Sequence, residues 1–310
     1  MKIWSLVVSV VVLLAGCAGA SGTTPQQSGK LAVVASFYPL QFIAERVGGD
    51  HVNVTSLTQP GVEPHDLELA PSQVASVSKA GLVVYQKEMQ PAVDKVVDSE
   101  KPRQVLEVTT VVPLHDHSDG DHADHEGHSA DDGHDHEGGD PHTWLDPTTM
   151  TAYATAMATK LGEVDPANAA DYQQRAAALV TELATLDQAY EKGLASCDRR
   201  TFITAHAAFS YLAERYKLEQ VSIAGLSPDT EPSPARVAEV QRIAKEKGVT
   251  TIFYETLTSP AVARSIAGDL RLRTDVLDPI EGLTDQSRGK DYIAVMTANL
   301  AALRTANGCR

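Results

Sequence analysis

Cysteine, clustered basic residues and long apolar segments are all scarce in this chain of 310 residues. Of its three cysteines, neither Cys197 nor Cys309 lies in a motif with a base nearby, which argues against catalysis by a reactive thiol. The formal net charge is −15 and no stretch gathers Lys and Arg, so no basic patch suggests a nucleic-acid partner. With 43% hydrophobic residues, the chain is still long enough for two globular domains, each with a buried core.

The first sixteen residues have the layout of a secretory signal. Lys2 precedes an apolar run from Leu6 to Leu14, which is too short to span a bilayer, and no later segment has the roughly 20 apolar residues that would. The run ends in Leu14-Ala15-Gly16-Cys17, which resembles a bacterial lipobox. We expect residues 1–16 to be a signal peptide and Cys17 to carry a lipid that holds the protein at the membrane; a buried cysteine is the alternative.

Residues 17–30 are rich in Gly, Ser, Thr and Gln and are typical of a flexible tether. The expected location is the extracytoplasmic face of a bacterial membrane, or the periplasm. Such a compartment is oxidising, so a disulfide between Cys197 and Cys309 is expected, with two free thiols as the alternative. It would tie the C-terminus to the start of the second lobe.

Short apolar runs that suit buried strands alternate with helical stretches along most of the chain, which predicts two α/β lobes with parallel sheets. The first lobe spans residues 31–164 and the second spans residues 195–310. The first contains expected strands at 31–36, 52–57 and 82–85 and helices at 39–47 and 71–79. The second contains expected strands at 200–204, 221–223, 250–254 and 276–277 and helices at 235–247, 261–270 and 287–306.

One long helix is predicted between the lobes, over residues 165–194. Asp165-Pro166 provides an N-cap followed by proline at the first helical position, and no helix-breaking residue follows until Gly193. Apolar residues recur at spacings of four and three from Tyr172 to Tyr190 and form one stripe. At 1.5 Å per residue the helix would run roughly 40 to 45 Å, long enough for a rigid strut between two lobes.

Seven of the eleven histidines lie in one acidic stretch. Residues 115–140 hold ten Asp or Glu and no Lys or Arg, and nothing apolar larger than alanine occurs between residues 115 and 136. The stretch cannot bury a core, so we expect it to be disordered without metal. Imidazole and carboxylate at this density favour weak zinc sites, and a solvated acidic loop is the alternative. Its histidines are His115, His117, His122, His125, His128, His134 and His136.

Three of the other four histidines follow expected strands or turns. His65, His142 and His206 lie where a strand gives way to a turn or helix, whereas His51 beside Asp50 is interpreted as a surface residue. Ligands of open α/β sheets bind outside the carboxyl ends of the strands, so these three side chains could converge.

Four motifs make the chain similar to one known family. They are Gly61 to His65, Asp140 to Pro147, Thr204 to Leu212 and Gly225 to Pro234. Together and in this order they resemble the zinc-binding members of the cluster A-I (TroA-like, ZnuA-type) solute-binding lipoproteins, from about residue 31 to the C-terminus. The resemblance implies two lobes joined by one long helix, one metal ion in the cleft, and delivery of Zn²⁺ to the membrane permease of an ABC importer by a monomeric protein that is not an enzyme.

The resemblance also implies a ligand set. His65 and His142 would bind metal from the first lobe and His206 from the second, with Glu281 as fourth ligand and Asp278 or a water as the alternative. Three imidazoles and one carboxylate suit tetrahedral Zn²⁺ better than Mn²⁺, which prefers more oxygen ligands, although Cu²⁺ and Ni²⁺ stay open. Residues 86–90 depart from the family pattern, which more often has a Gly-rich turn there.

Two other functions compete with transport. A zinc hydrolase could use three histidines and a glutamate, but the sequence lacks a compact His-Glu-x-x-His motif. A surface adhesin or zinc-sequestering protein could rely on the histidine-rich stretch alone, without any tight site in the cleft.

Overall fold

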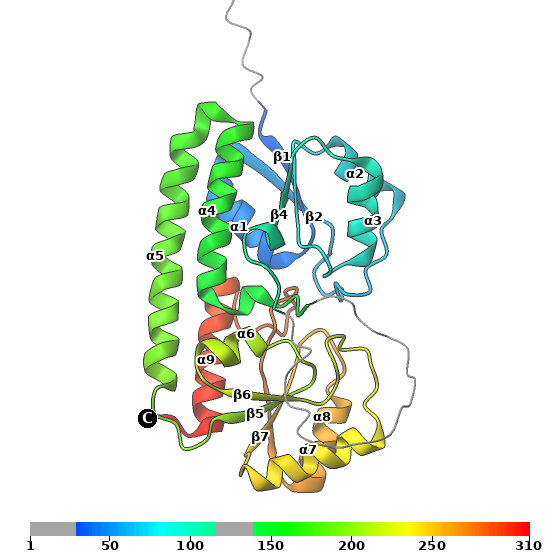
Figure 1. The fold of residues 1–310 in the computed structure, drawn as a ribbon, viewed down its shortest axis with the longest axis vertical. Coiled ribbons are helices and arrows are strands. Elements are labelled where there is room, and N and C mark those ends of the chain that lie inside the picture. The colour runs from blue at the N-terminus through cyan, green and yellow to red at the C-terminus, as the bar shows by residue number, and fades with distance from the viewer. Residues whose placement is uncertain (1–28, 116–138) are drawn as a thin grey trace, which may run out of the picture.

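Two four-stranded parallel sheets form the centres of two lobes (Figure 1). The computed structural model describes residues 29–115 and 139–310. In the first lobe the strand order is β2-β1-β3-β4. Its strands are β1 (Leu31–Ala35), β2 (Val52–Ser56), β3 (Leu82–Tyr85) and β4 (Val105–Glu107), and its helices are α1 (Tyr38–Gly48), α2 (Pro71–Lys79) and α3 (Pro91–Glu100), with 3₁₀ turns η1 (Gly49–His51) and η2 (Val108–Thr110).

The second lobe repeats this plan with the order β6-β5-β7-β8. Its strands are β5 (Thr201–Thr204), β6 (Glu219–Ser222), β7 (Thr251–Tyr254) and β8 (Arg273–Val276), and its helices are α6 (Ser210–Arg215), α7 (Pro234–Glu246), α8 (Ala261–Leu270) and α9 (Tyr292–Asn307). The predicted class of two parallel α/β lobes is confirmed. The last helix begins at Tyr292 and not near residue 287, because the Asp291 side chain accepts a hydrogen bond from the main-chain N–H of Ala294 and caps it there.

The central strands of each sheet are largely buried on both faces because both faces are covered. Along β1, Val33 joins the large core on the side of α1, while Val34 joins a smaller core with Val77 of α2 and Val93 of α3. Successive side chains of a strand point to opposite faces, so a strand covered on both sides must be continuously apolar. This explains why β1 and β3 are continuously apolar, whereas the edge strand β2 alternates between buried and more exposed residues.

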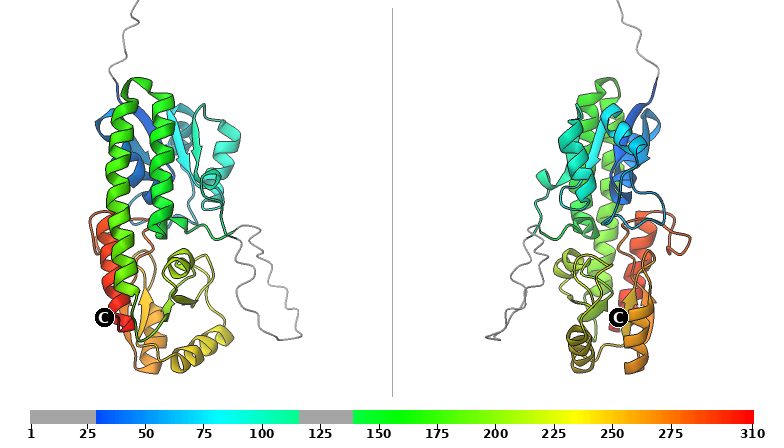
Figure 2. Two further views of the ribbon diagram at one scale, coloured as in Figure 1. Left: turned by 60° about the vertical axis from the view of Figure 1, so that its left-hand side comes forward. Right: turned by 90° about the vertical axis from the view of Figure 1, so that its right-hand side faces the viewer.

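A helical hairpin connects the lobes. The helix α4 (Pro147–Val164) belongs to the first lobe, turns at η4 (Pro166–Asn168) and packs against α5 (Ala169–Leu194), which runs down to the second lobe (Figure 2). With 26 residues, α5 is roughly 39 Å long. The expected stripe is buried at every position: Tyr172, Ala176, Leu179, Leu183, Leu186 and Tyr190.

The long helix starts at Ala169 and not at Asp165, which corrects the predicted boundary. Asp165 ends α4, and its carboxylate accepts hydrogen bonds from the Asn168 amide and from the hydroxyl of Tyr172, both at 2.7 Å. Those bonds close the turn between the two helices, so Pro166 begins a 3₁₀ turn and not the long helix itself.

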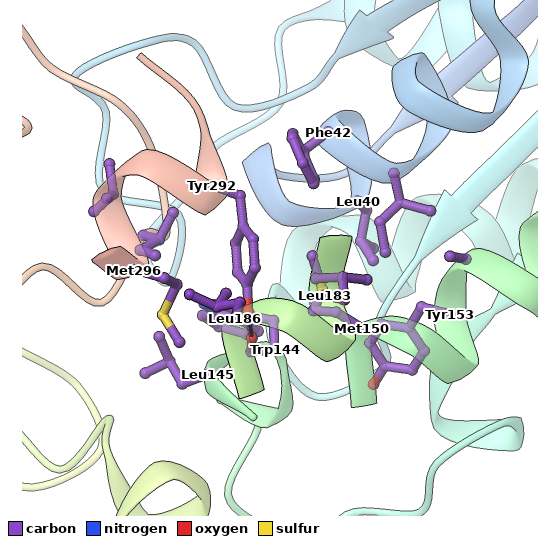
Figure 3. Close-up of a cluster of buried hydrophobic side chains, with 14 of the residues drawn as sticks. Leu40, Phe42, Trp144, Leu145, Met150, Tyr153, Leu183, Leu186, Tyr292 and Met296 are labelled. Atoms are coloured by element: carbon purple, nitrogen blue, oxygen red, sulfur yellow. Dashed lines mark hydrogen bonds between the residues drawn. The ribbon is translucent and has the colours of Figure 1, made fainter. Parts of the chain in front are cut away.

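One hydrophobic core runs through both lobes where they meet (Figure 3). It joins residues of α1, α4, α5 and α9 with the turn η3 (Thr143–Leu145). There the Tyr292 hydroxyl donates to the Trp144 carbonyl at 2.6 Å, and the Trp144 indole donates to the Pro279 carbonyl at 2.7 Å. These bonds join the segment that leads to His142 to the segment that leads to Glu281.

A disulfide joins Cys197 and Cys309, 112 residues apart, beside the end of α9. No helix within residues 29–115 and 139–310 is both long and apolar enough to cross a membrane. The lipobox cysteine Cys17 and the signal and tether, residues 1–28, lie outside the described residues.

Candidate metal centre

Four side chains from four separate loops meet between the two sheets. His65 lies in the loop after β2 and His142 lies just before η3, while His206 directly follows β5 and Glu281 lies in the loop after β8. One potential ligand atom of each lies within 4.8 Å of the others, and no second such group of three or more His, Cys, Asp or Glu occurs in the described part of the chain. His142, His206 and Glu281 are fully buried.

The spacing of these atoms fits a tetrahedral ion. Nε2 of His142 lies 3.3 Å from Nε2 of His65 and 3.4 Å from Nε2 of His206. Oε1 of Glu281 lies 3.2, 3.3 and 3.5 Å from Nε2 of His142, His206 and His65, respectively. Bonds of 2.0 to 2.1 Å from a central Zn²⁺ to its ligands would place neighbouring ligands about 3.3 to 3.4 Å apart. All five distances fall close to that value.

A carboxylate fixes the ring of His142. Nδ1–H of His142 donates to Oδ1 of Asp140 at 2.7 Å, and the same oxygen accepts the main-chain N–H of His142 at 2.9 Å. Burial alone would lower the pKa of His142, but the charges and hydrogen bonds of Asp140 and Glu281 outweigh it and raise the pKa. The second oxygen of Asp140 accepts the hydroxyl of Ser210 on α6, so Asp140 also connects the two lobes.

His206 has the same kind of partner in Glu255, which follows β7. Nδ1–H of His206 donates to Oε1 of Glu255 at 2.5 Å. Burial opposes protonation, but the charge and hydrogen bond of Glu255, followed by those of Glu281, raise the pKa of His206 well above its usual value. With Nδ1 donating to a carboxylate, Nε2 of each ring is the nitrogen that can bind a metal, once the proton it shares with Glu281 has left.

Glu281 carries charge where no water reaches it. Burial would raise its pKa, but hydrogen bonds from His142, His206 and His65 bring the pKa well below the ordinary value for a carboxyl group. Its other oxygen, Oε2, is buried without a hydrogen-bond partner among the described residues. Buried charges in proteins are paired or coordinate metals, so the four side chains form a suitable set of donors for a divalent cation.

Asp278, the other carboxylate considered for the fourth position, serves the loop itself and is not part of the cluster. Its Oδ1 accepts the main-chain N–H of Ile280 at 2.8 Å, and its Oδ2 accepts the hydroxyls of Thr256 at 3.1 Å and Ser287 at 3.0 Å. Ile280 has a φ of 60°, in the left-handed region. The tight turn that Asp278 closes therefore directs Glu281 into the cleft.

The remaining predicted residues lie elsewhere. His51 pairs with Asp171 of α5 at 2.8 Å and is only partly exposed, so it has a partner that its sequence neighbours do not suggest. His115 forms an antiparallel bridge with Asp140 and lies 3.3 Å from Glu214. The other six histidines of the histidine-rich stretch lie outside the described residues.

Sequence reasoning did not identify the carboxylates that hydrogen-bond to the ligand histidines. Asp140 lies two residues before His142, and that spacing is the signal in the sequence that points to its role. Glu255 is 49 residues from its partner His206. Its place just after a strand was the one hint. Glu63 was also missed: its Oε1 accepts the main-chain N–H of His65 at 3.1 Å, and burial followed by the charge of Glu281 raises its pKa to about 9.

Comparisons with known proteins agree with this geometry. The sequence profile of zinc-uptake complex component A, periplasmic (ZnuA) matches residues 33–306. The zinc-binding lipoprotein AdcA of Streptococcus pneumoniae is 37% identical over 289 residues, which cover 90% of this chain and 56% of AdcA. The high-affinity zinc uptake system protein ZnuA of Bacillus subtilis is 33% identical over 98% of this chain and 97% of its own length. The chain thus spans about half of AdcA but nearly all of that ZnuA.

Solved structures show the same fold. Zn(II)-bound AdcA of Streptococcus pneumoniae superposes with a TM-score of 0.75 at 35% identity, over 90% of this chain and 58% of AdcA. The laminin-binding protein Lmb of Streptococcus agalactiae, described as having adhesin and metal-transporting activity, gives a TM-score of 0.76 at 32% identity, over 89% of this chain and 99% of Lmb. Since the family profile covers nearly the whole described chain and the B. subtilis protein aligns from end to end, this chain belongs to the ZnuA family.

Proposed function

We propose that this protein captures Zn²⁺ between its two lobes and delivers it to the permease of an ABC-type importer. The observation that carries the proposal is the cluster of three imidazole nitrogens and one carboxylate oxygen at tetrahedral spacing. The zinc-binding and zinc-uptake proteins to which the chain is similar support it.

In this proposal His65, His142, His206 and Glu281 bind one zinc ion. Three neutral nitrogen donors and a single oxygen favour Zn²⁺ over Mn²⁺, which prefers more oxygens and a higher coordination number. Cu²⁺ and Ni²⁺ compete for the same donors, so selectivity against them rests on the tetrahedral arrangement.

The division of ligands between lobes suits transport. His65 and His142 belong to one lobe while His206 and Glu281 belong to the other, so any separation of the lobes takes ligands away from the ion. A hydrolytic zinc site keeps an open position for water, whereas here protein atoms supply all four positions. The site therefore supports capture and release of an ion and not catalysis.

The leader, the tether, the histidine-rich stretch and the domain limits complete the proposal. Residues 1–16 direct export, and a lipid on Cys17 holds the protein at the extracytoplasmic face of the membrane through the tether at 17–30. The stretch from His115 to His136 gathers zinc weakly. The lobes comprise residues 31–164 and 195–310, with residues 165–194 between them.

Zinc titration against a competing chelator tests the proposal. We expect one tight site in the wild type, its loss in His206→Ala, and wild-type affinity in His51→Ala, which removes a histidine that lies outside the cluster. Deleting residues 116–138 should remove weaker sites and leave the tight one. If that deletion abolished nearly all zinc binding while His206→Ala did not, sequestration by the histidine-rich stretch would replace transport as the function.

Adhesion is the second candidate, and the similarity to Lmb favours it. Binding of the purified protein to immobilised laminin, measured with and without zinc, separates the two. Laminin binding unchanged in His206→Ala would show an adhesive surface independent of the metal site, whereas zinc uptake by cells should depend on His206.

A further inference from the structure

Every loop that carries a proposed zinc ligand is held by a carboxamide side chain that makes no hydrogen bond to the metal-binding atoms themselves. We propose that Gln86, Gln90, Gln220 and Asn299 are positioning residues that hold the four ligand loops in their metal-binding arrangement before zinc arrives. This inference rests on the proposed function and deepens it, since it concerns how the same site is built.

Gln90 holds the loop of His65. Its side chain is 1% exposed, and Nε2 donates to the carbonyl of Pro64 at 3.3 Å and to the hydroxyl of Thr58 at 2.9 Å. Thr58 in turn donates to the carbonyl of Ser36 at 2.9 Å, at the carboxyl end of β1. The residue preceding the ligand is thereby connected to the central strand of the sheet.

Gln86 holds the segment of His142 on both sides. Its Nε2 donates to the carbonyl of Pro141, and its Oε1 accepts the hydroxyl of Thr143 at 3.3 Å. That hydroxyl also pairs with the hydroxyl of Tyr153 on α4 at 2.7 Å. One amide group therefore binds the residue before the ligand and the residue after it.

Gln220 acts on the ligand residue itself in the second lobe. From β6, its Nε2 donates to the carbonyl of His206 at 3.0 Å and to the hydroxyl of Thr204 at 2.8 Å. Its Oε1 accepts the main-chain N–H of Phe209 at 3.1 Å. The turn between β5 and α6 is thus closed around one side-chain amide.

Asn299 of α9 holds the start of the Glu281 loop. Its Nδ2 donates to the carbonyl of Asp278 at 2.7 Å, and its Oδ1 accepts the main-chain N–H of Asp278 at 3.0 Å. Asp278 then closes the turn that presents Glu281. Asn299 is 2% exposed, so water does not compete for either bond.

The chemistry of a carboxamide explains why this residue type recurs. A loop has main-chain donors and acceptors that need partners once buried, and one carboxamide can supply both kinds, as Gln220 and Asn299 do. Gln90 uses only its donor, and its Oε1 is buried without a hydrogen-bond partner among the described residues. A carboxamide has no charge to add to the carboxylates around the ion, and it does not titrate. A carboxylate in the same place could satisfy only donors and would add negative charge beside Glu281 and Glu255.

His65 depends most on this arrangement. Asp140 orients the ring of His142 and Glu255 orients that of His206, but Nδ1 of His65 has no hydrogen-bond partner among the described residues. The position of His65 therefore follows from its main chain, which Gln90 holds at Pro64. Gln86 and Gln90 lie at the two ends of the loop between β3 and α3.

The test compares full-length wild type with Gln90→Leu, Gln86→Leu and Gln220→Leu. Each is measured for zinc affinity, for the visible spectrum of bound Co²⁺ and for the melting temperature of the metal-free protein. Tyr190→Phe is the control, because it removes a buried hydrogen bond to a main-chain carbonyl, that of Met296, without contacting a ligand loop. Loss of a positioning residue should raise the Kd for zinc about 10- to 100-fold and alter the Co²⁺ spectrum. Tyr190→Phe should lower only the melting temperature.

Leucine variants that bind zinc as tightly as the wild type, with an unchanged Co²⁺ spectrum, would overturn the inference even if they melt earlier. Wild type that binds no zinc would instead overturn the proposed function. If the variants do not fold, hydrogen exchange on metal-free wild type decides. Main-chain amides around His65, His142 and His206 should exchange as slowly without zinc as with it, and protection that arises only with zinc would refute preorganisation.

Discussion

Replacing Glu255 by glutamine should weaken zinc binding although Glu255 does not touch the ion. Its carboxylate is 3% exposed and accepts the Nδ1–H of His206 at 2.5 Å, and glutamine has nearly the same shape without the charge. If the glutamine oxygen faces the ring, His206 keeps its tautomer. The substitution then removes a charge and little else.

The size of the effect follows from two contributions. A hydrogen bond to a charged group stabilises by about 1.5–3 kcal/mol and a neutral one by about 0.5–1.5 kcal/mol, a difference of about 1–1.5 kcal/mol. A carboxylate roughly 6 to 7 Å from Zn²⁺ across the ring attracts it by about 5 kcal/mol at an effective dielectric constant of 20. The same carboxylate also stabilises the protonated ring in the metal-free protein, which offsets part of that attraction. We expect a net rise in Kd of about 10- to 100-fold, as for other groups that orient metal-binding histidines.

The pH dependence of the affinity gives the sharper measurement. Glu255 raises the pKa of His206 in the metal-free protein, and that proton must leave before zinc binds. The wild-type affinity should therefore fall as the pH is lowered from 8, whereas in Glu255→Gln the fall should begin at a lower pH. Chelator competition across this range, with Glu246→Gln on α7 as an equal change of charge far from the ion, tests both parts. A Kd within about threefold of wild type at pH 8, or an unshifted pH profile, would refute the reasoning.

Two further predictions concern stability. The rise in melting temperature on adding zinc should shrink as pH falls from 8 towards 6. The raised pKa values of His142 and His206 stabilise the metal-free protein fully below the unfolded pKa, and this stabilisation is lost as pH rises through the folded values, whereas the zinc-bound form needs neutral rings. Calorimetry would contradict this if the zinc-induced shift grew at low pH. Replacing Cys197 and Cys309 together by serine opens a loop of 112 residues and should lower the free energy of unfolding by about 2–5 kcal/mol. Urea unfolding should show that loss with zinc affinity unchanged, and a change in Kd would mean that the disulfide also shapes the site.

Local patterns were enough for the class of the fold and for much of its interior. Continuous apolar runs identified the central strands, because a strand buried on both faces needs apolar residues throughout. The stripe from Tyr172 to Tyr190 identified the helix between the lobes, because a helix buried on one face has apolar residues at spacings of three and four. The helix α4 was not predicted, although the sequence has comparable signals for it. Asp146-Pro147 provides a cap followed by proline, and apolar residues follow at helical spacing through Leu161. Its omission explains why the long helix was expected to begin at Asp165.

The three histidines could be named in advance because each stands at a recognisable motif after a strand or turn. Glu281 was expected as the fourth ligand only through the resemblance, with Asp278 as the alternative, since both lie in the same short segment. The choice between the two depends on the hydrogen bonds that Asp278 makes with its own turn and on Asn299, which holds that turn from α9. Composition and residue spacing do not predict which distant side chain will be the hydrogen-bond partner of a given residue.

The sequence by itself determined what kinds of atoms could bind an ion and roughly where each strand would deliver them. Only the tertiary structure decided that they meet, which carboxylate joins them, and that Glu255, Gln86 and Gln90 hold them in place. The physical reason is that a metal site depends on distances of a few ångströms between loops far apart in the chain. Those distances are fixed by the packing of two sheets against a shared core and not by any one segment.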